Sequence, residues 1–268
     1  MDSIRENRTK EDVICEIQLE LSEDIENTKS IILVEGSDDI SFVKGVFDEN
    51  VVAIESFSGV HDVETLLEDP SLQMPNIIAI RDRDYMDIRT LKAKMFLYDC
   101  CCLELMLLNN SYITKRFYEL YYRGSKRQED YLVDIMKCLA PFSMLRKKNA
   151  VEGNHINFHK FGFGDLVKIN EMFDMQALFE RARQLETVYE ECVEEAGLLS
   201  EGELWNITNG HDMCRYLGEV SKIGKANLGE TGVRKILLGM FRKEDFRNTE
   251  LYQAISEYQE DNDVHFVS

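Results

Sequence analysis

A pair of acidic residues in the first third of the sequence has the spacing for metal-dependent chemistry. Asp82 and Asp84 stand one residue apart, directly after the apolar run at 77–80. Residues two apart in an extended chain point the same way, so both carboxylates are expected to face one pocket. Such carboxylates repel each other unless a proton or a cation lies between them. Mg²⁺ is a hard cation that prefers these oxygen ligands.

A third carboxylate, Glu35, follows a second apolar run at 31–34. Short apolar runs between turn residues are typical of strands buried on both faces of a parallel sheet. Ligands of open α/β sheets bind beyond the carboxyl ends of the strands, so the three acids should converge there. We expect Asp82 and Asp84 to hold Mg²⁺ or Mn²⁺, and Glu35 to be a further ligand or the base that activates water. Alternatively, Asp-Arg-Asp simply ends a strand in a solvated turn.

Two more residues are candidates for the same site. Glu104 lies in the first turn of a helix expected at 103–109, just beyond a strand expected at 94–98. A carboxylate there can complete the metal site or merely favour the helix dipole. His211 follows a turn into a helix. It could face the substrate as a phosphate binder or proton shuttle, or form a buried or N-capping pair with Asp212.

The sequence is strongly acidic, with 31 Lys and Arg against 50 Asp and Glu and a net charge of −19. Proteins that bind nucleic acid are usually basic because phosphate contacts dominate affinity. A nucleic-acid substrate would therefore need a local basic patch, metal ions or a partner. Three groups of cations could form that patch or be solvated helix faces: Arg116, Arg123, Lys126 and Arg127; Arg146, Lys147 and Lys148; Lys222, Lys225, Arg234, Lys235, Arg242 and Lys243. We expect the second group to bind substrate phosphate.

The elements that must position these residues form an α/β fold with a mostly parallel sheet flanked by helices. Strands are expected at 31–34, 51–57, 77–80 and 94–98, with helices near 37–47 and 60–67, while 9–21 fits either a helix or a strand. Apolar residues then recur at helical spacing in 112–121, 131–145, 172–192 and 231–240, and 156–163 alternates weakly like a short β segment. We expect a catalytic domain with an N-terminal extension over 1–115 and a mainly helical region packed on it over 116–268.

From composition we expect a cytoplasmic protein rather than a membrane or secreted one. No apolar run is long enough to span a bilayer, and no apolar stretch follows a basic start at the N-terminus. The seven cysteines lack the paired spacing of a disulfide framework, which favours a reducing compartment.

Several blocks of the sequence resemble one family of proteins. A strand ending in Glu-Gly and a later strand ending in Asp-x-Asp resemble the Toprim domain of topoisomerases, primases and OLD-type nucleases. Six ordered blocks are similar to a family of stand-alone Toprim proteins that includes the effector of the PARIS anti-phage system. They are FSGVHDVETLL (57–67), IRDRDY (80–85), LYDCCCLELMLL (97–108), PFSMLRK (141–147), NGHDM (209–213) and FRNTELYQAI (246–255).

This resemblance implies a function and partners that composition cannot reveal. It implies a metal-dependent nuclease, toxin-like, that cuts tRNA during phage infection. It also implies an ABC-type ATPase partner that holds the nuclease inactive, and a homodimer after release. Within the family an acid occupies the block of Glu104, and Gly-His-Asp is a hallmark block.

Two other classes of function remain open from the sequence. One is a non-catalytic Toprim module that binds or regulates. The other is a Mg²⁺-dependent small-molecule phosphoryl-transfer enzyme or glycosyltransferase, since Asp-x-Asp occurs in both. Phosphatases with this motif usually carry Thr or Ser after the second Asp, where this chain has Tyr85, and they leave Glu35 without a role. A metal-dependent shift in melting temperature would distinguish a metal enzyme from a degenerate module.

Overall fold

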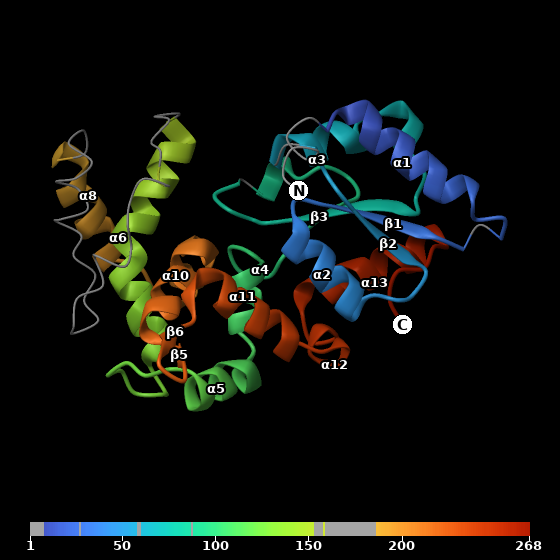
Figure 1. Ribbon diagram of the computed structural model, residues 1–268. Coiled ribbons are helices and arrows are strands. Elements are labelled where there is room, and N and C mark those ends of the chain that lie inside the picture. The colour runs from blue at the N-terminus through green and yellow to red at the C-terminus, as the bar shows by residue number, and fades with distance from the viewer. Residues whose placement is uncertain (1–7, 27, 58–59, 87, 153–157, 159–185) are drawn as a thin grey trace. The chain divides into compact units, whose positions relative to one another are not determined.

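The computed structural model describes residues 8–26, 28–57, 60–86, 88–152, 158 and 186–268 (Figure 1). The chain divides into two compact units, one formed by residues 1–99 and 241–268 and the other by residues 100–240. The division differs from the predicted boundary near residue 115, because the last part of the chain returns to the first unit. The β segment predicted at 156–163 lies outside the described residues except for Phe158, as does most of the helical stretch predicted at 172–192.

The first unit contains a four-stranded, all-parallel sheet. Its strands are β1 (Ser30–Val34), β2 (Val51–Glu55), β3 (Ile77–Arg81) and β4 (Met95–Leu97), in the order β2-β1-β3-β4. Every residue of β1 and β3 is buried. The two apolar runs therefore form the centre of the sheet, as both-face burial in a parallel sheet requires. The predicted α/β fold with a parallel sheet is confirmed.

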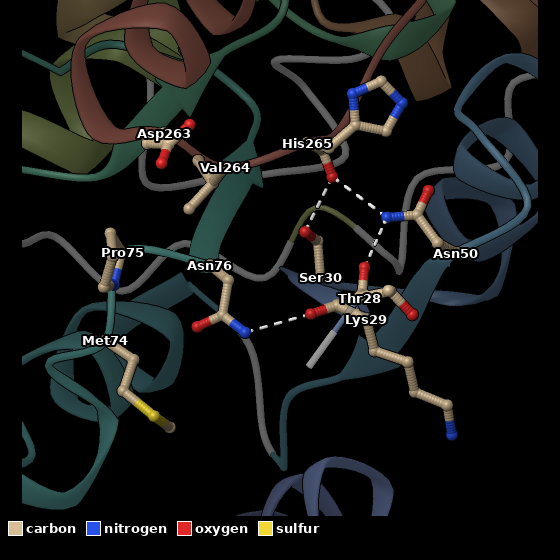
Figure 2. A pocket seen from close by; sticks show the side chains of 10 residues that line it. All are labelled: Thr28, Lys29, Ser30, Asn50, Met74, Pro75, Asn76, Asp263, Val264 and His265. Carbon is tan, nitrogen blue, oxygen red and sulfur yellow. Dashed lines mark hydrogen bonds between the residues drawn. The ribbon is translucent and has the colours of Figure 1, made fainter. Parts of the chain in front are cut away.

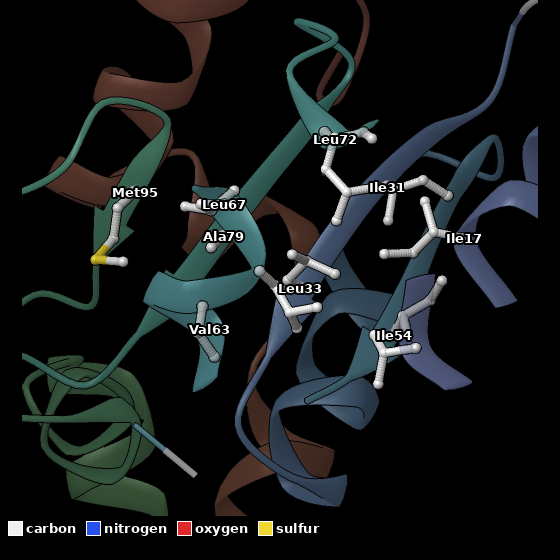
Figure 3. Packing of buried hydrophobic residues seen from close by; sticks show 12 residues of the cluster. Ile17, Ile31, Leu33, Ile54, Val63, Leu67, Leu72, Ala79 and Met95 are labelled. Carbon is white, nitrogen blue, oxygen red and sulfur yellow. The ribbon is translucent and has the colours of Figure 1, made fainter. Parts of the chain in front are cut away.

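Helices cover both faces of this sheet. Figure 1 shows α1 (Lys10–Ser22) and α3 (Val60–Leu67) on one side, and α2 (Ser37–Val46) and α13 (Glu250–Asn262) on the other. On the first side, alternate strand residues pack with side chains of α1 and α3 in one apolar cluster (Figure 3): Val13, Ile17, Ile31, Leu33, Val63, Leu67, Ile77 and Ala79. The ambiguous stretch at 9–21 is thus a helix, and Thr9 and Asp12 form its capping box.

Aromatic rings fill the other side of the sheet, where the C-terminal segment returns. Phe42 of α2 lies 5.5 Å from the ring of Tyr98 and 5.5 Å from the ring of Phe246, which ends the short helix α12 (Lys243–Phe246). Asp99 accepts hydrogen bonds from the first two backbone N–H groups of α13, both at 2.9 Å. Ring packing and helix capping therefore anchor the C-terminal segment to the sheet.

The second unit is mainly helical, as predicted for this part of the chain. Its described elements are α4 (Leu103–Leu108), α5 (Ser111–Leu120), α6 (Tyr131–Glu152), α8 (Glu186–Gly197), α9 (Glu201–Ile207), α10 (Gly210–Val220), the hairpin strands β5 (Lys222–Ile223) and β6 (Ala226–Asn227), and α11 (Gly229–Met240). Helices α10 and α11 approach closely, since a Cβ added to Gly218 would lie 2.5 Å from the carbonyl carbon of Gly229.

Within the described ranges, none of the helices has both the length and the apolar character needed to cross a lipid bilayer.

Candidate functional site

The sheet brings Glu35 and Asp82 to the same edge. Glu35 directly follows β1 and Asp82 directly follows β3, and these strands are parallel neighbours in the sheet. The register pairs Leu33 with Ala79, so continuing it by two residues places Glu35 beside Arg81. The Nε atom of Arg81 indeed lies 3.6 Å from Oε1 of Glu35. Glu35 and Asp82 therefore lie at the edge of the sheet that the two apolar runs predicted.

Glu35 is held in an unusual environment for a carboxylate. Its side chain is only 20% exposed, and its Oε1 atom is buried without a hydrogen-bond partner in the described part of the chain. Burial raises the pKa of Glu35 to about 7 against the lowering effect of Arg81, and the charges of Asp84 and Asp39 raise it further. A carboxyl group in this position favours a proton or an incoming cation as its neighbour.

The backbone conformation at Asp84 differs from the predicted extended one. Its φ angle is 46°, so it occupies the left-handed region in a turn instead of continuing the strand. The rule that residues two apart point the same way therefore does not extend from Asp82 to Asp84. Asp is among the residues that tolerate this conformation. Both aspartates are partly buried, and Asp84 still acts electrostatically on Glu35.

Sequence patterns missed several residues around these acids. Arg81 is the last residue of β3 and 3% exposed; its Nη1 donates to Oε1 of Glu64 at 2.8 Å. Asp39 accepts hydrogen bonds from the backbone N–H of Gly36 at 2.9 Å and from the hydroxyl of the buried Tyr98 at 2.7 Å. One sign of Arg81 was present in the sequence, a cation directly after an apolar strand run. Because most arginines are exposed, this position alone did not predict a buried side chain.

The donor chemistry at this edge fits a hard divalent cation. Glu35, Asp82 and Asp84 offer only carboxylate oxygens, and one oxygen of Glu35 is buried and lacks a donor in the described residues. In the arrangement seen here, no three His, Cys, Asp or Glu side chains of the described ranges are grouped as a metal cage. Mg²⁺ usually takes one or two protein carboxylates and completes its shell with water and substrate phosphate. A ligand set centred on Glu35 is compatible with that pattern.

Glu104 belongs to the second unit, where it contacts the Gly-His-Asp block. It lies in the first turn of α4 and is 8% exposed. A Cβ added to Gly210 would lie 2.3 Å from its Oε2 atom and 2.4 Å from Sγ of Cys102. A side chain at position 210 would therefore force Glu104 or Cys102 to move. This long-range contact joins two blocks that the sequence presents separately.

His211 is oriented by an acid that sequence patterns did not single out. Its Nδ1 lies 2.6 Å from Oε1 of Glu230, and the other oxygen of Glu230 accepts a hydrogen bond from Nε of Arg215 at 2.6 Å. The hydrogen bond with Glu230 raises the pKa of His211 despite its partial burial, and Glu104 adds to the rise. The imidazole side chain is 51% exposed. A histidine of this kind can bind phosphate or transfer a proton.

The cations predicted to bind substrate phosphate have carboxylate partners within the second unit. Arg146 forms two hydrogen bonds with the fully buried Asp212, and its guanidinium lies 4.3 Å from the ring centre of Phe158. Lys148 pairs with Glu191 at 2.9 Å and with Glu195 at 3.1 Å. Lys147 is exposed. Substrate contact by this group stays a prediction, but two of its three charges are already compensated.

The first unit also has a hollow at the opposite edge of the sheet. This cavity of about 710 Å³ lies where the strands begin and the C-terminal segment passes (Figure 2). Its polar groups largely bond one another: Ser30 Oγ donates to the carbonyl of His265 at 2.7 Å, and Asn76 Nδ2 to that of Lys29 at 2.9 Å. None of the predicted acids lines this hollow. We therefore place the candidate site at the carboxyl ends of the strands.

Comparison of the sequence with models of known protein families and with curated proteins found no match.

Proposed function

We propose that this chain is a metal-dependent nuclease that hydrolyses phosphodiester bonds of nucleic acid. The observation that carries the proposal is Glu35, a largely buried carboxyl group with a raised pKa, near Asp84 at the carboxyl ends of parallel strands. One of its oxygens accepts no hydrogen bond from the described residues. Acids gathered in this way are typical of sites that bind Mg²⁺ or Mn²⁺. The resemblance to stand-alone Toprim nucleases supports the same reaction.

The roles of the residues follow from this placement. Glu35, Asp82 and Asp84 would hold the metal, which when bound polarises the phosphate and makes a bound water more acidic. Glu35 can also accept a proton near neutral pH, because its pKa is about 7. Arg81 keeps Glu35 in place from the neighbouring strand. Glu104 as a further ligand, and His211 as a phosphate binder or proton shuttle, are the roles we propose for the second unit.

The resemblance also supports a specific setting for this activity. We propose tRNA as the substrate, the cytoplasm as the compartment, an ABC-type ATPase as the partner that restrains the nuclease, and a homodimer as the active form. Co-expression with candidate ATPases, followed by size measurement in solution, would test the partner and the dimer.

One observation favours a second candidate, a non-catalytic binding module. Arg81 already places a positive charge 3.6 Å from Glu35, and a metal ion bound to Glu35 would supply the same kind of charge. In such a module the arginine would replace the metal. The two candidates differ in their response to divalent cations.

Incubation of the purified protein with tRNA and with plasmid DNA tests the proposal directly. Cleavage should require Mg²⁺ or Mn²⁺, stop with a chelator, and disappear in Glu35→Gln and Asp84→Asn. Asn suits position 84 because it tolerates the left-handed backbone found there. Hydrolysis of a small phosphate ester, with both nucleic acids left intact, would instead support a small-molecule enzyme. Inactivity on every substrate, with no metal-dependent melting shift, would support the module.

A further inference from the structure

Two basic segments that are distant in sequence are joined in the second unit. Tyr122 and Ser221 form an antiparallel β-bridge, flanked by backbone hydrogen bonds from Lys222 to Tyr121 and from Arg123 to Val220, both at 3.0 Å. The bridge places the loop after α5 against the β5-β6 hairpin, as Figure 1 shows. Cations that the sequence separates by about one hundred residues therefore share one surface.

We define the basic surface as residues 115–127 and 221–227. These segments contain seven Lys or Arg side chains and one Glu, in a chain whose net charge is −19. The cations are Lys115, Arg116, Arg123, Lys126, Arg127, Lys222 and Lys225. Some are compensated, since Arg116 pairs with Glu119 at 3.2 Å and Arg127 with Asp130 at 2.6 Å. In the part of the chain that the structure describes, Lys115, Lys222 and Lys225 are exposed and form no ion pair.

Exposed apolar and aromatic side chains lie on the basic surface and directly beside it in the sequence. Ile223, between Lys222 and the turn of the hairpin, is 59% exposed. Tyr112 is 52% exposed and stands three residues before Lys115 on α5, so the two side chains share a helix face. Cations beside exposed aromatic rings are the combination with which proteins hold phosphates and stack bases.

We infer that the basic surface binds the phosphodiester backbone of the nucleic acid that this chain cleaves. The inference rests on the proposed function and assigns its substrate contact to a different surface from residues 146–148. Arg146 and Lys148 are compensated by Asp212, Glu191 and Glu195. The three exposed lysines of the basic surface form no ion pair with any described residue. In a chain this acidic, uncompensated cations that lie together give a polyanion a place to bind.

Replacement of Lys115, Lys222 and Lys225 by Gln tests the inference. A matched control replaces three other exposed lysines, Lys44, Lys92 and Lys137, by Gln, so both variants lose the same charge. Binding of labelled tRNA and of a DNA duplex would be measured by fluorescence anisotropy at several salt concentrations, with a chelator present so that nothing is cleaved. All six positions are exposed, so both variants should melt like the wild type.

The three lost contacts should weaken binding by on the order of 100-fold at 0.1 M salt and reduce the slope of log affinity against log salt by about two to three. The control should keep both values. Equal losses in the two variants, or no loss in either, would overturn the assignment of this surface. The proposed nuclease function would still hold after that result if the wild type cleaved tRNA or plasmid with Mg²⁺. A wild type that neither binds nor cleaves either nucleic acid would overturn both.

Discussion

Replacement of Glu35 by Gln should make the metal-free protein more stable at alkaline pH. The pKa of Glu35 is about 7 in the folded protein and near its ordinary value of 4.5 in the unfolded chain. Below pH 4.5 both states carry the proton, and its contribution to stability is fully present. As pH rises from 4.5 to 7, the unfolded chain releases the proton first, so the free energy of unfolding falls. Above pH 7 the contribution is lost.

The size of this effect follows from the shift of about 2.5 pKa units. At 1.36 kcal/mol per unit, the charged Glu35 lowers the free energy of unfolding by about 3 kcal/mol at pH 8. Glutamine has a similar shape and no charge, so Glu35→Gln should regain most of that amount. For a chain of this size the gain corresponds to roughly 6–12 °C in melting temperature. At pH 4.5 the variant and the wild type should melt within a few degrees of each other.

Thermal unfolding followed by circular dichroism from pH 4.5 to 8, with a chelator and then with Mg²⁺ or Mn²⁺, measures both parts of this reasoning. The metal should raise the melting temperature of the wild type at pH 8 and leave Glu35→Gln unchanged. Glu55→Gln is a matched control, because Glu55 ends the neighbouring strand β2 at the same edge. Its melting temperature measures the effect of removing a different carboxylate from this edge. A Glu35→Gln variant no more stable than the wild type at pH 8 would show that Arg81 fully compensates the charge.

Two further substitutions test contacts of the second unit. Glu230→Gln should lower the pKa of His211, because Glu230 is the hydrogen-bond partner that raises it. If the imidazole pKa measured by NMR titration is the same in the variant and the wild type, the effect belongs to Glu104 instead. Gly218→Ala should destabilise the protein by about 1–3 kcal/mol in denaturant unfolding, because its Cβ would meet the backbone of α11. Gly239→Ala, whose Cβ meets nothing within 4 Å, is the matched control and should leave stability unchanged or slightly raised.

Local patterns predicted the centre of the fold well. The apolar runs at 31–34 and 77–80 predicted β1 and β3, and the acids after them were correctly placed at the strand ends. A buried run followed by turn residues constrains the chain strongly, because few other structures satisfy its backbone and bury its side chains. The helices α2 and α3 were predicted for a similar reason, since their apolar residues recur at helical spacing.

Features that depend on distant contacts could not be predicted in this way. Nothing local indicates that residues 241–268 return to the sheet, because the link is made by groups such as Phe42 and Asp99 far back in the chain. The contact between Glu104 and Gly210 is equally invisible in sequence. The turn at Asp84 was missed because the extended geometry of β3 was assumed to continue past Arg81.

Glu35 and Glu230 show why burial alone does not identify a cation site. Their side chains are almost equally exposed, 20% and 21%, yet the pKa of Glu35 is about 7 and that of Glu230 is about 2. Burial raises the pKa of both acids. The difference comes from their neighbours, because His211 and Arg215 each lie 2.6 Å from Glu230, while Glu35 faces two aspartates and one arginine at 3.6 Å.

An incoming cation would therefore gain more at Glu35 than at Glu230, whose negative charge is already compensated by the protein. Glu230 instead fixes the orientation of a half-exposed histidine that can meet an anion. The two acids thus predict different responses to divalent metal. Mg²⁺ should shift the NMR signals of residues around Glu35 more than that of the His211 imidazole. An equal shift at His211 would contradict this contrast between the two acids.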